Sequence, residues 1–207
     1  MCVSFACRYA GPFLSLSPEC CFVIEWVDGS DGGYSNRTLT HSRVVGYALG
    51  AAAAKEFAER SAAEYLPVAA RRYHGDAGPS SSSSSTDGAE PGDQDDKEGP
   101  KTDFPNEREV LQSFEDSCLP PESVYSRYPA LVSIKCLPDF QDTIAPKRLA
   151  LILMSVLKTC GCFGAYVETK IWEKNASEAY ARLGFYEISA LQEEMQESES
   201  QYLGRLL

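Results

Sequence analysis

The first half of the chain contains two apolar runs separated by a polar connection. Residues 20–27 and 43–49 are mostly apolar, with β-branched and aromatic members, so each run predicts a strand. Residues 28–42 are rich in Gly, Ser, Asn and Asp, which suits a long exposed loop between the strands of a hairpin. Residues 51–65 have a helix-favouring composition and predict a helix that ends before Pro67.

The second half contains a strand followed by a helix with an apolar face. Residues 129–137 alternate apolar and polar side chains over part of their length and predict a strand. Residues 146–159 predict a strong helix, with Gly161 and Gly164 beyond its end. Its apolar side chains recur at spacings of three and four, which predicts one face packed against a sheet: Leu149, Ile152, Leu153, Val156 and Leu157.

Strand and helix patterns continue to alternate after this helix. Residues 165–168 predict a strand, residues 175–183 a helix and residues 185–188 a further strand, and residues 202–207 can add one more. A strand, helix, strand, helix, strand order implies parallel neighbours joined by right-handed crossovers. We therefore predict an α/β fold class.

One segment interrupts the pattern. Residues 75–103 contain the serine run 80–85 and almost no apolar residues, so ordering them would cost chain entropy without burial to offset it. We interpret this segment as a disordered insert, with a phosphorylation or docking segment as the alternative. Residues 1–74 then form the N-terminal half of a single domain and residues 104–207 its C-terminal half, in which residues 106–114 predict a short amphipathic helix.

Charge argues against a nucleic-acid partner. The formal net charge is −11, but residues 75–103 carry eight Asp and Glu against two Lys, which leaves −5 for the remainder of the chain. This mildly acidic balance comes without the Lys/Arg-rich face that phosphate contacts need. A basic peptide or protein partner is compatible with it, and the oligomeric state is not indicated.

The cysteines indicate neither a disulfide framework nor a metal centre. The eight cysteines include the adjacent pair Cys20 and Cys21 and the pair Cys160 and Cys162, but no Cys-x-x-Cys spacing, and we interpret most of them as buried thiols. The N-terminus has no signal-peptide pattern and the chain has no long uncharged apolar run, so we expect no membrane span and a cytoplasmic or nuclear protein.

A resemblance to a known family adds to these expectations. Residues 175–185, in which a helix bearing Tyr180 runs into Leu-Gly-Phe, resemble the last conserved motif of the GNAT acetyltransferase superfamily. Further segments look like the C-terminal domain of protein O-GlcNAcases: residues 13–25, 46–50, 151–161, 164–168 and 203–205. The resemblance implies a mixed central sheet with helices on both faces, here without the usual N-terminal strand and helix, and it does not extend to a glycoside hydrolase domain.

The resemblance implies acetyl transfer from acetyl-CoA to an amine, with two catalytic candidates. Tyr180 matches the tyrosine that would donate a proton to the departing thiolate, and Asp142 matches the acidic residue that would accept a proton from the amine. Each residue also has a structural interpretation. Tyr180 could pack against the following strand, and Asp142 could cap the helix that follows it.

The resemblance also places the cofactor at the start of the long helix. Superfamily members bind the CoA diphosphate there on a Gly-rich loop, where free N–H groups and the helix dipole favour an anion. In this chain Ile144 replaces the middle glycine and Pro146 lacks an N–H, so tight acetyl-CoA binding is not expected. The cofactor-binding residues that the resemblance implies are Leu137, Gln141, Thr143, Ile144, Ala145, Lys147 and Arg148.

Two functions therefore stay open at the level of the sequence. The first is a GNAT-like N-acetyltransferase that acts on a protein or peptide acceptor. The second is a pseudo-acetyltransferase whose cleft serves as a protein-binding module, because fold alone does not fix function. The catalytic interpretation requires the turn before the long helix to face Tyr180 across a parted pair of parallel strands.

Overall fold

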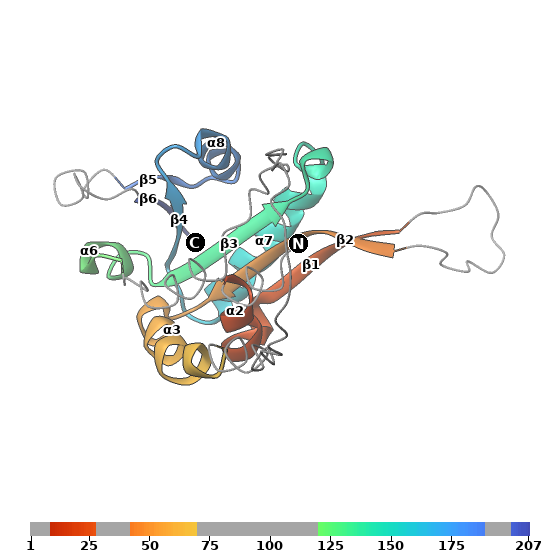
Figure 1. Ribbon diagram of the computed structural model, residues 1–207. Helices are drawn as coiled ribbons and strands as arrows, with labels where there is room; N and C mark the ends of the chain where they lie inside the picture. The colour runs from red at the N-terminus through yellow and green to blue at the C-terminus, as the bar shows by residue number, and fades with distance from the viewer. Residues whose placement is uncertain (1–8, 28–41, 70–119, 189–199) are drawn as a thin grey trace, which may run out of the picture.

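The computed structural model describes residues 9–27, 42–69, 120–188 and 200–207, which form a six-stranded mixed sheet with helices on both faces (Figure 1). The predicted insert and the predicted helix at 106–114 lie outside the described residues. The strands are β1 (Cys21–Val27), β2 (Ser42–Ala51), β3 (Ala130–Cys136), β4 (Gly164–Lys170), β5 (Tyr186–Glu187) and β6 (Ser200–Leu206). The helices and helical turns are α2 (Gly11–Leu16), η1 (Pro18–Cys20), α3 (Ala54–Arg60), η2 (Ser61–Tyr65), α6 (Glu122–Tyr125), η3 (Pro138–Phe140), α7 (Ile144–Thr159) and α8 (Lys174–Arg182).

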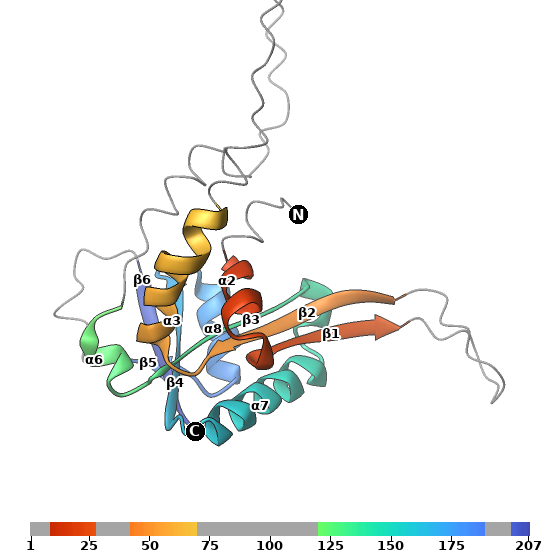
Figure 2. The ribbon, with the colours of Figure 1, turned by 90° about the horizontal axis from the view of Figure 1, so that it is seen from below.

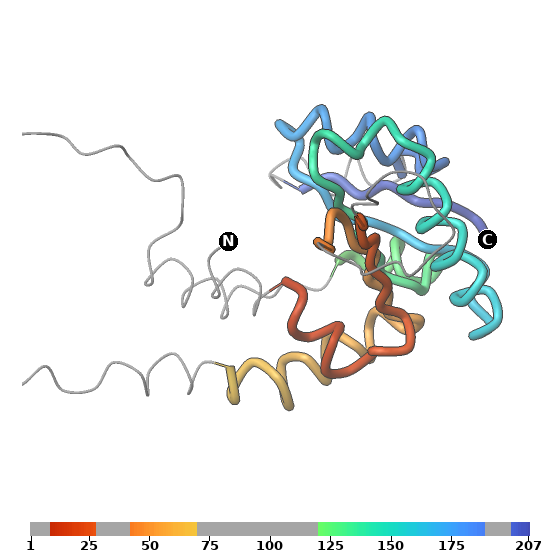
Figure 3. Tube along the Cα trace, turned by 90° about the vertical axis from the view of Figure 1, so that its right-hand side faces the viewer, coloured from red at the N-terminus to blue at the C-terminus, as the bar shows by residue number. Residues whose placement is uncertain are grey.

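The sheet lies between two layers of helices. Its strand order is β1-β2-β3-β4-β6-β5. The helices α7 and α8 cover one face, and α2 and α3 lie on the other, as the views in Figures 2 and 3 show. The α/β class and the helices on both faces are therefore confirmed. Within the described residues no strand precedes β1, and the helix there is the short α2.

The N-terminal hairpin forms as predicted. β1 and β2 pair antiparallel from Cys21 opposite Leu49 to Val27 opposite Ser42, with a register shift between Ile24 and Glu25. The helix predicted over residues 51–65 begins at Ala54, because β2 extends to Ala51 and still pairs with β3 there. The expected end before Pro67 was wrong, since the backbone stays helical through residues 66–69.

The long helix α7 packs on the sheet through a narrower stripe than predicted. Leu149, Leu153 and Leu157 are buried, and Val156 packs against the same core. The prediction for Ile152 was wrong, since that side chain is 49% exposed while Met154 is buried. At about 100° per residue, Ile152 and Met154 lie on opposite sides of Leu153, and the sheet covers only the Met154 side.

The expected parallel neighbours occur once. β3 and β4, which flank α7, are parallel neighbours. The strand at 185–188 was also expected to lie beside β4, and this was wrong. β6 lies between them and pairs antiparallel with both β4 and β5. The alternation of strands and helices predicted correctly that β4 and β5 run in the same direction. The position of β6 between them decides that they are not neighbours.

Two glycines end the helices that flank the candidate site. Gly161 and Gly184 have positive φ values of 87° and 84°, which a side chain would strain. After α8, the N–H of Gly184 donates to Ala181 O and the N–H of Phe185 to Tyr180 O, at 3.0 and 3.1 Å. This pair of bonds is the Schellman motif, and it explains the Leu-Gly-Phe sequence in physical terms: glycine turns the chain, and Phe185 then enters the core.

No described helix has the length and apolar character needed to cross a bilayer. Among the described residues, no three His, Cys, Asp or Glu side chains gather where they could hold a metal ion. The described cysteines are free thiols; Cys20 and Cys162 are buried and Cys160 is exposed.

Candidate functional site

β3 and β4 separate soon after they begin to pair. Their parallel pairing covers only Ala130 with Ala165 and Leu131 with Tyr166, although each strand runs for seven residues. Beyond this point the edge of β3 that faces β4 has no strand partner in the part of the chain that the structure describes. Unpaired backbone groups must find other partners or water, so the gap is a natural place for a ligand.

A pocket of about 300 Å³ lies along this open edge, between the start of α7 and one face of α8. Its size is at the lower end of the range for small-molecule sites. The residues that line it come from β3, the β3–α7 connection, α7 and α8. They are Ile134, Lys135, Cys136, Gln141, Asp142, Thr143, Pro146, Lys147, Asn175, Ala176, Ala179, Tyr180, Arg182 and Leu183.

Tyr180 lies in the gap itself. Its hydroxyl donates to Ile134 O and accepts from the N–H of Ile134, both at 3.0 Å. The side chain is buried, and its ring contacts Phe185 edge to face at a centroid distance of 5.7 Å. Burial raises the pKa of Tyr180 to about 12, so its hydroxyl stays protonated at neutral pH.

Tyr47 of β2 is a second tyrosine near this site, partly buried, and it acts on the pKa of Tyr180 through its charge. Burial raises the pKa of Tyr47, which is therefore also a neutral phenol at physiological pH.

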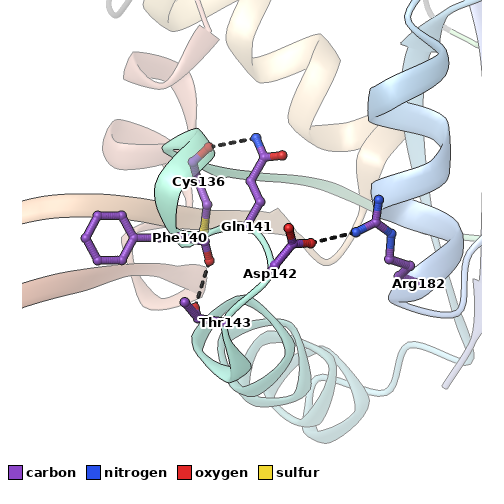
Figure 4. A network of polar contacts seen from close by, with 6 residues as sticks. All are labelled: Cys136, Phe140, Gln141, Asp142, Thr143 and Arg182. Atoms are coloured by element: carbon purple, nitrogen blue, oxygen red, sulfur yellow. Dashed lines mark hydrogen bonds and ion pairs between the residues drawn. The ribbon is translucent and has the colours of Figure 1, made fainter.

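Asp142 lies at the mouth of the pocket, in contact with Arg182 rather than with the helix (Figure 4). Arg182 Nη1 donates to Asp142 Oδ1 at 2.9 Å, and the two side chains are 58% and 89% exposed. The residue at the N-cap of α7 is Thr143, and its hydroxyl bonds backward to Phe140 O at 2.7 Å. Asp142 therefore joins the start of α7 to the end of α8.

The loop that would bind a diphosphate has become part of the helix. Ile144 is the first residue of α7, so it has helical backbone angles without the strain expected at a glycine position. Its side chain is 63% exposed and does not line the pocket. Pro146 does line the pocket, and its missing N–H leaves the first turn with fewer donors for an anion.

The structure brings together some of the predicted site residues and not others. Tyr180 and Asp142 both line the pocket, together with Gln141, Thr143 and Lys147. The others do not line it: Leu137, Ile144, Ala145 and Arg148. The requirement that the turn before α7 should face Tyr180 at a parted pair of parallel strands is met.

Sequence reasoning missed two cations of the pocket. Lys135 and Arg182 line it together with Lys147, against the single carboxylate of Asp142. Lys135 gave no signal beyond its place in a strand. Arg182 stands inside the recognised motif, two residues after Tyr180, and the helical period could have placed it on the pocket side with Ala179.

Comparisons with known proteins agree with this architecture. No protein-family model matches the sequence. Protein O-GlcNAcase of Rattus norvegicus and of Mus musculus are each 27% identical over 188 residues, which covers 89% of this chain and 16% of the relative. The crystal structure of SsHAT matches with a TM-score of 0.64 and 26% identity, over 98% of this chain and 80% of that one.

The chain thus spans only a small share of the length of the curated relatives it matches, whereas it spans most of SsHAT. The chain is a GNAT-like domain, homologous to the small C-terminal part of protein O-GlcNAcase.

Proposed function

We propose that this GNAT-like domain binds acetyl-CoA in the pocket between α7 and α8 and transfers the acetyl group to an amine of a protein or peptide. The observation that carries the proposal is the pocket at the parted strands, lined by three cations and by Tyr180. The acetyltransferase-like fold that the chain shares with SsHAT supports the choice of ligand.

The charge around the pocket suits an anionic ligand in an otherwise acidic chain. Lys135, Lys147 and Arg182 line the pocket. Asp142 would oppose a diphosphate, but its ion pair with Arg182 at 2.9 Å offsets that charge. Lys147, in the first turn of α7, can then meet a phosphate group, which basic side chains bind through charge-assisted hydrogen bonds.

The backbone of β3 suits the amide-containing arm of the ligand. Ile134 and Cys136 line the pocket at the edge that β4 leaves open. An extended chain with amide groups can pair with such an edge as an added strand would. The pocket volume of about 300 Å³ fits the arm and the acetyl group, while the nucleotide would lie outside on the surface.

Bound acetyl-CoA would supply an acyl thioester that an amine can attack. Tyr180 would stabilise the departing thiolate as a hydrogen-bond donor. The CoA thiolate would then take its proton from solvent, since burial raises the pKa of Tyr180 and disfavours loss of its proton. Asp142, exposed at the pocket mouth, would accept the proton that the amine nitrogen loses as it attacks the acyl carbon and the C–S bond breaks.

A second function is favoured by the state of Tyr180. Its hydroxyl already satisfies both backbone groups of Ile134, as a purely structural tyrosine would. Pro146 removes a donor at the point where a diphosphate would need one. In this alternative the chain is a pseudo-acetyltransferase, and the pocket and its surroundings bind a protein or peptide.

Isothermal titration calorimetry with acetyl-CoA separates the two functions. We expect micromolar affinity and a ligand-dependent rise in melting temperature. Lys147→Ala should weaken binding by about tenfold, because it removes one charge-assisted contact. Lys158→Ala is the matched control, since Lys158 is exposed on the same helix and does not line the pocket. Absence of binding at millimolar ligand would contradict the acetyltransferase proposal.

Turnover then tests the role of Tyr180. Release of CoA from acetyl-CoA in the presence of amine-containing peptides should be followed by chromatography, because thiol reagents would also label exposed Cys160. Tyr180→Phe should lower kcat by about 10²-fold or more if the hydroxyl assists the leaving thiolate. An unchanged kcat would remove Tyr180 from the mechanism and leave the pocket assignment intact.

A further inference from the structure

The hydroxyl of Tyr180 is fully engaged before any ligand arrives. A phenol has one proton to donate, and here that proton goes to Ile134 O at 3.0 Å. The same oxygen accepts the N–H of Ile134, also at 3.0 Å. One side chain thus occupies both backbone groups that Ile134 presents toward the gap.

A second side chain continues the same pattern along β3. Gln141 Nε2 donates to Cys136 O at 3.3 Å, so the next residue that faces the gap also has a side-chain partner. In a continuous sheet, β4 would supply these bonds, but its pairing with β3 ends at Leu131. Tyr180 and Gln141, which themselves line the pocket, therefore occupy three backbone groups of this edge: the N–H and C=O of Ile134 and the C=O of Cys136.

We propose that Tyr180 is a latch on the edge of β3, which must release Ile134 before an extended amide chain can pair with that strand. The inference rests on the proposed function at one point: the extended amide chain is taken to be the acyl-carrying arm of acetyl-CoA. The latch sets affinity: a ligand group that accepts from the N–H of Ile134 replaces the bond that this N–H already makes to the hydroxyl, so part of the binding energy is spent on displacement.

The hydroxyl and the ring of Tyr180 are held by different contacts, and the hydroxyl bonds only to the backbone of Ile134 in the hydrogen bonds described above. The ring is held separately, edge to face against the fully buried Phe185. Removal of the hydroxyl alone should therefore leave the packing of the ring in place and free the strand edge.

Tyr180→Phe should bind acetyl-CoA about tenfold more tightly than the wild type, because the net value of one to two hydrogen bonds is no longer lost on binding. Two controls accompany it in calorimetry. Adenosine 3′,5′-bisphosphate carries phosphates but no amide arm, and its affinity should not change. Tyr166→Phe removes a buried hydroxyl that does not line the pocket, and it should leave both affinities unchanged.

The outcomes separate the latch from the proposed function. A wild type that binds acetyl-CoA, with a Tyr180→Phe variant of equal or lower affinity, overturns the latch and leaves the proposed function standing. Tighter binding of both ligands by the variant also overturns the latch, because its effect would not be confined to the arm. Binding by the variant alone supports the latch and contradicts acetyl-CoA use by the wild type. No binding by either chain overturns both.

Circular dichroism and a melting curve must first show that Tyr180→Phe is folded. If it is not, crystals of the wild type soaked in acetyl-CoA decide the matter. A Tyr180 hydroxyl that has moved out of hydrogen-bond distance of Ile134 supports the latch. Bound ligand beside two intact bonds to Ile134 overturns it, as does a crystal that takes up no ligand at all.

Discussion

The two ends of β3 satisfy their backbone groups in different ways. At one end, Ala130 and Leu131 pair with β4, strand against strand. At the other end, Ile134 bonds to the hydroxyl of Tyr180, from a helix 46 residues further along the chain. Backbone pairing joins β3 to β4 at successive residues, whereas the hydroxyl of Tyr180 joins β3 to α8 at one residue. The first end serves the stability of the domain, and the second can exchange its partner for a ligand.

The surroundings of the two ends of β3 differ as well. Ala130 and Val132 contact the apolar core that contains Leu153 of α7, and none of these side chains is exposed by more than 1%. Near Ile134 and Cys136 the core gives way to a pocket in which charged and polar groups join the apolar ones. Burial of a polar ligand costs free energy unless it finds hydrogen-bond partners, so the parting of the strands and the change of lining together make a site.

The largest effect on stability is expected at the end of β3 that pairs with β4. Leu153→Ala should lower the free energy of unfolding by about 2–5 kcal/mol, because it leaves a cavity under the sheet where no side chain can readily fill it. Urea unfolding measures the change. Leu151→Ala is the control, since Leu151 is 55% exposed on the same helix and its loss should cost no more than about 0.5 kcal/mol. Equal effects for the two variants would contradict the packing described for α7.

A smaller effect is expected at the open end. Tyr180→Phe should lower the free energy of unfolding by about 1–3 kcal/mol at neutral pH, because Ile134 loses the partner of both its backbone groups. The same variant is expected to bind acetyl-CoA more tightly, so stability and affinity should change in opposite directions. A variant as stable as the wild type would show that water replaces the hydroxyl fully and that the latch is weak.

Alkaline pH should remove the extra stability that the wild type has over Tyr180→Phe. The folded pKa of Tyr180 is about 12 against an ordinary value of 10.0. The unfolded chain therefore loses this proton first, and the stabilisation is complete below pH 10, then declines as pH rises through the folded pKa. Urea unfolding of the wild type and of Tyr180→Phe at several pH values should show the difference shrinking over this range. A constant difference would contradict burial of the hydroxyl.

The smallest effect is expected at the mouth of the pocket. Arg182→Ala should change the free energy of unfolding by less than about 1 kcal/mol, because an exposed ion pair is screened by water. It should nevertheless weaken acetyl-CoA binding, since it removes a cation and leaves Asp142 uncompensated. Raising the salt concentration should reduce the binding difference. Arg60→Ala, which breaks an exposed pair with Glu64 away from the pocket, is the matched control.

Helices and strands could be predicted from the sequence more reliably than the order of the strands in the sheet. The spacing of Leu149, Leu153 and Leu157 marked the buried face of α7 correctly, because the helical period is a local property. Ile152 was misplaced because the period allows a stripe wider than the one the sheet covers. The place of β6 between β4 and β5 could not be predicted, since it depends on which strand edge the last segment finds.

The residues of the candidate site could likewise be predicted only in part. The resemblance of residues 175–185 to a GNAT motif led to Tyr180, and the turn before the long helix led to Asp142. The cations Lys135 and Arg182 were missed because they lie on different elements and meet only across the pocket. The helical cap considered for Asp142 does not form: the N-cap residue of α7 is Thr143, and the carboxylate of Asp142 bonds to Arg182.

The sequence by itself determined the succession of strands and helices, the apolar stripe that attaches α7 to the sheet, and the glycines that end α7 and α8. These are local properties, set by side-chain period and backbone conformation within a few residues. Only the tertiary structure decided that β3 and β4 part after two residue pairs, that Tyr180 bonds to Ile134, and that Arg182 meets Asp142. The last two contacts join residues 46 and 40 positions apart, and such distant groups meet only when the whole sheet and its helices have packed.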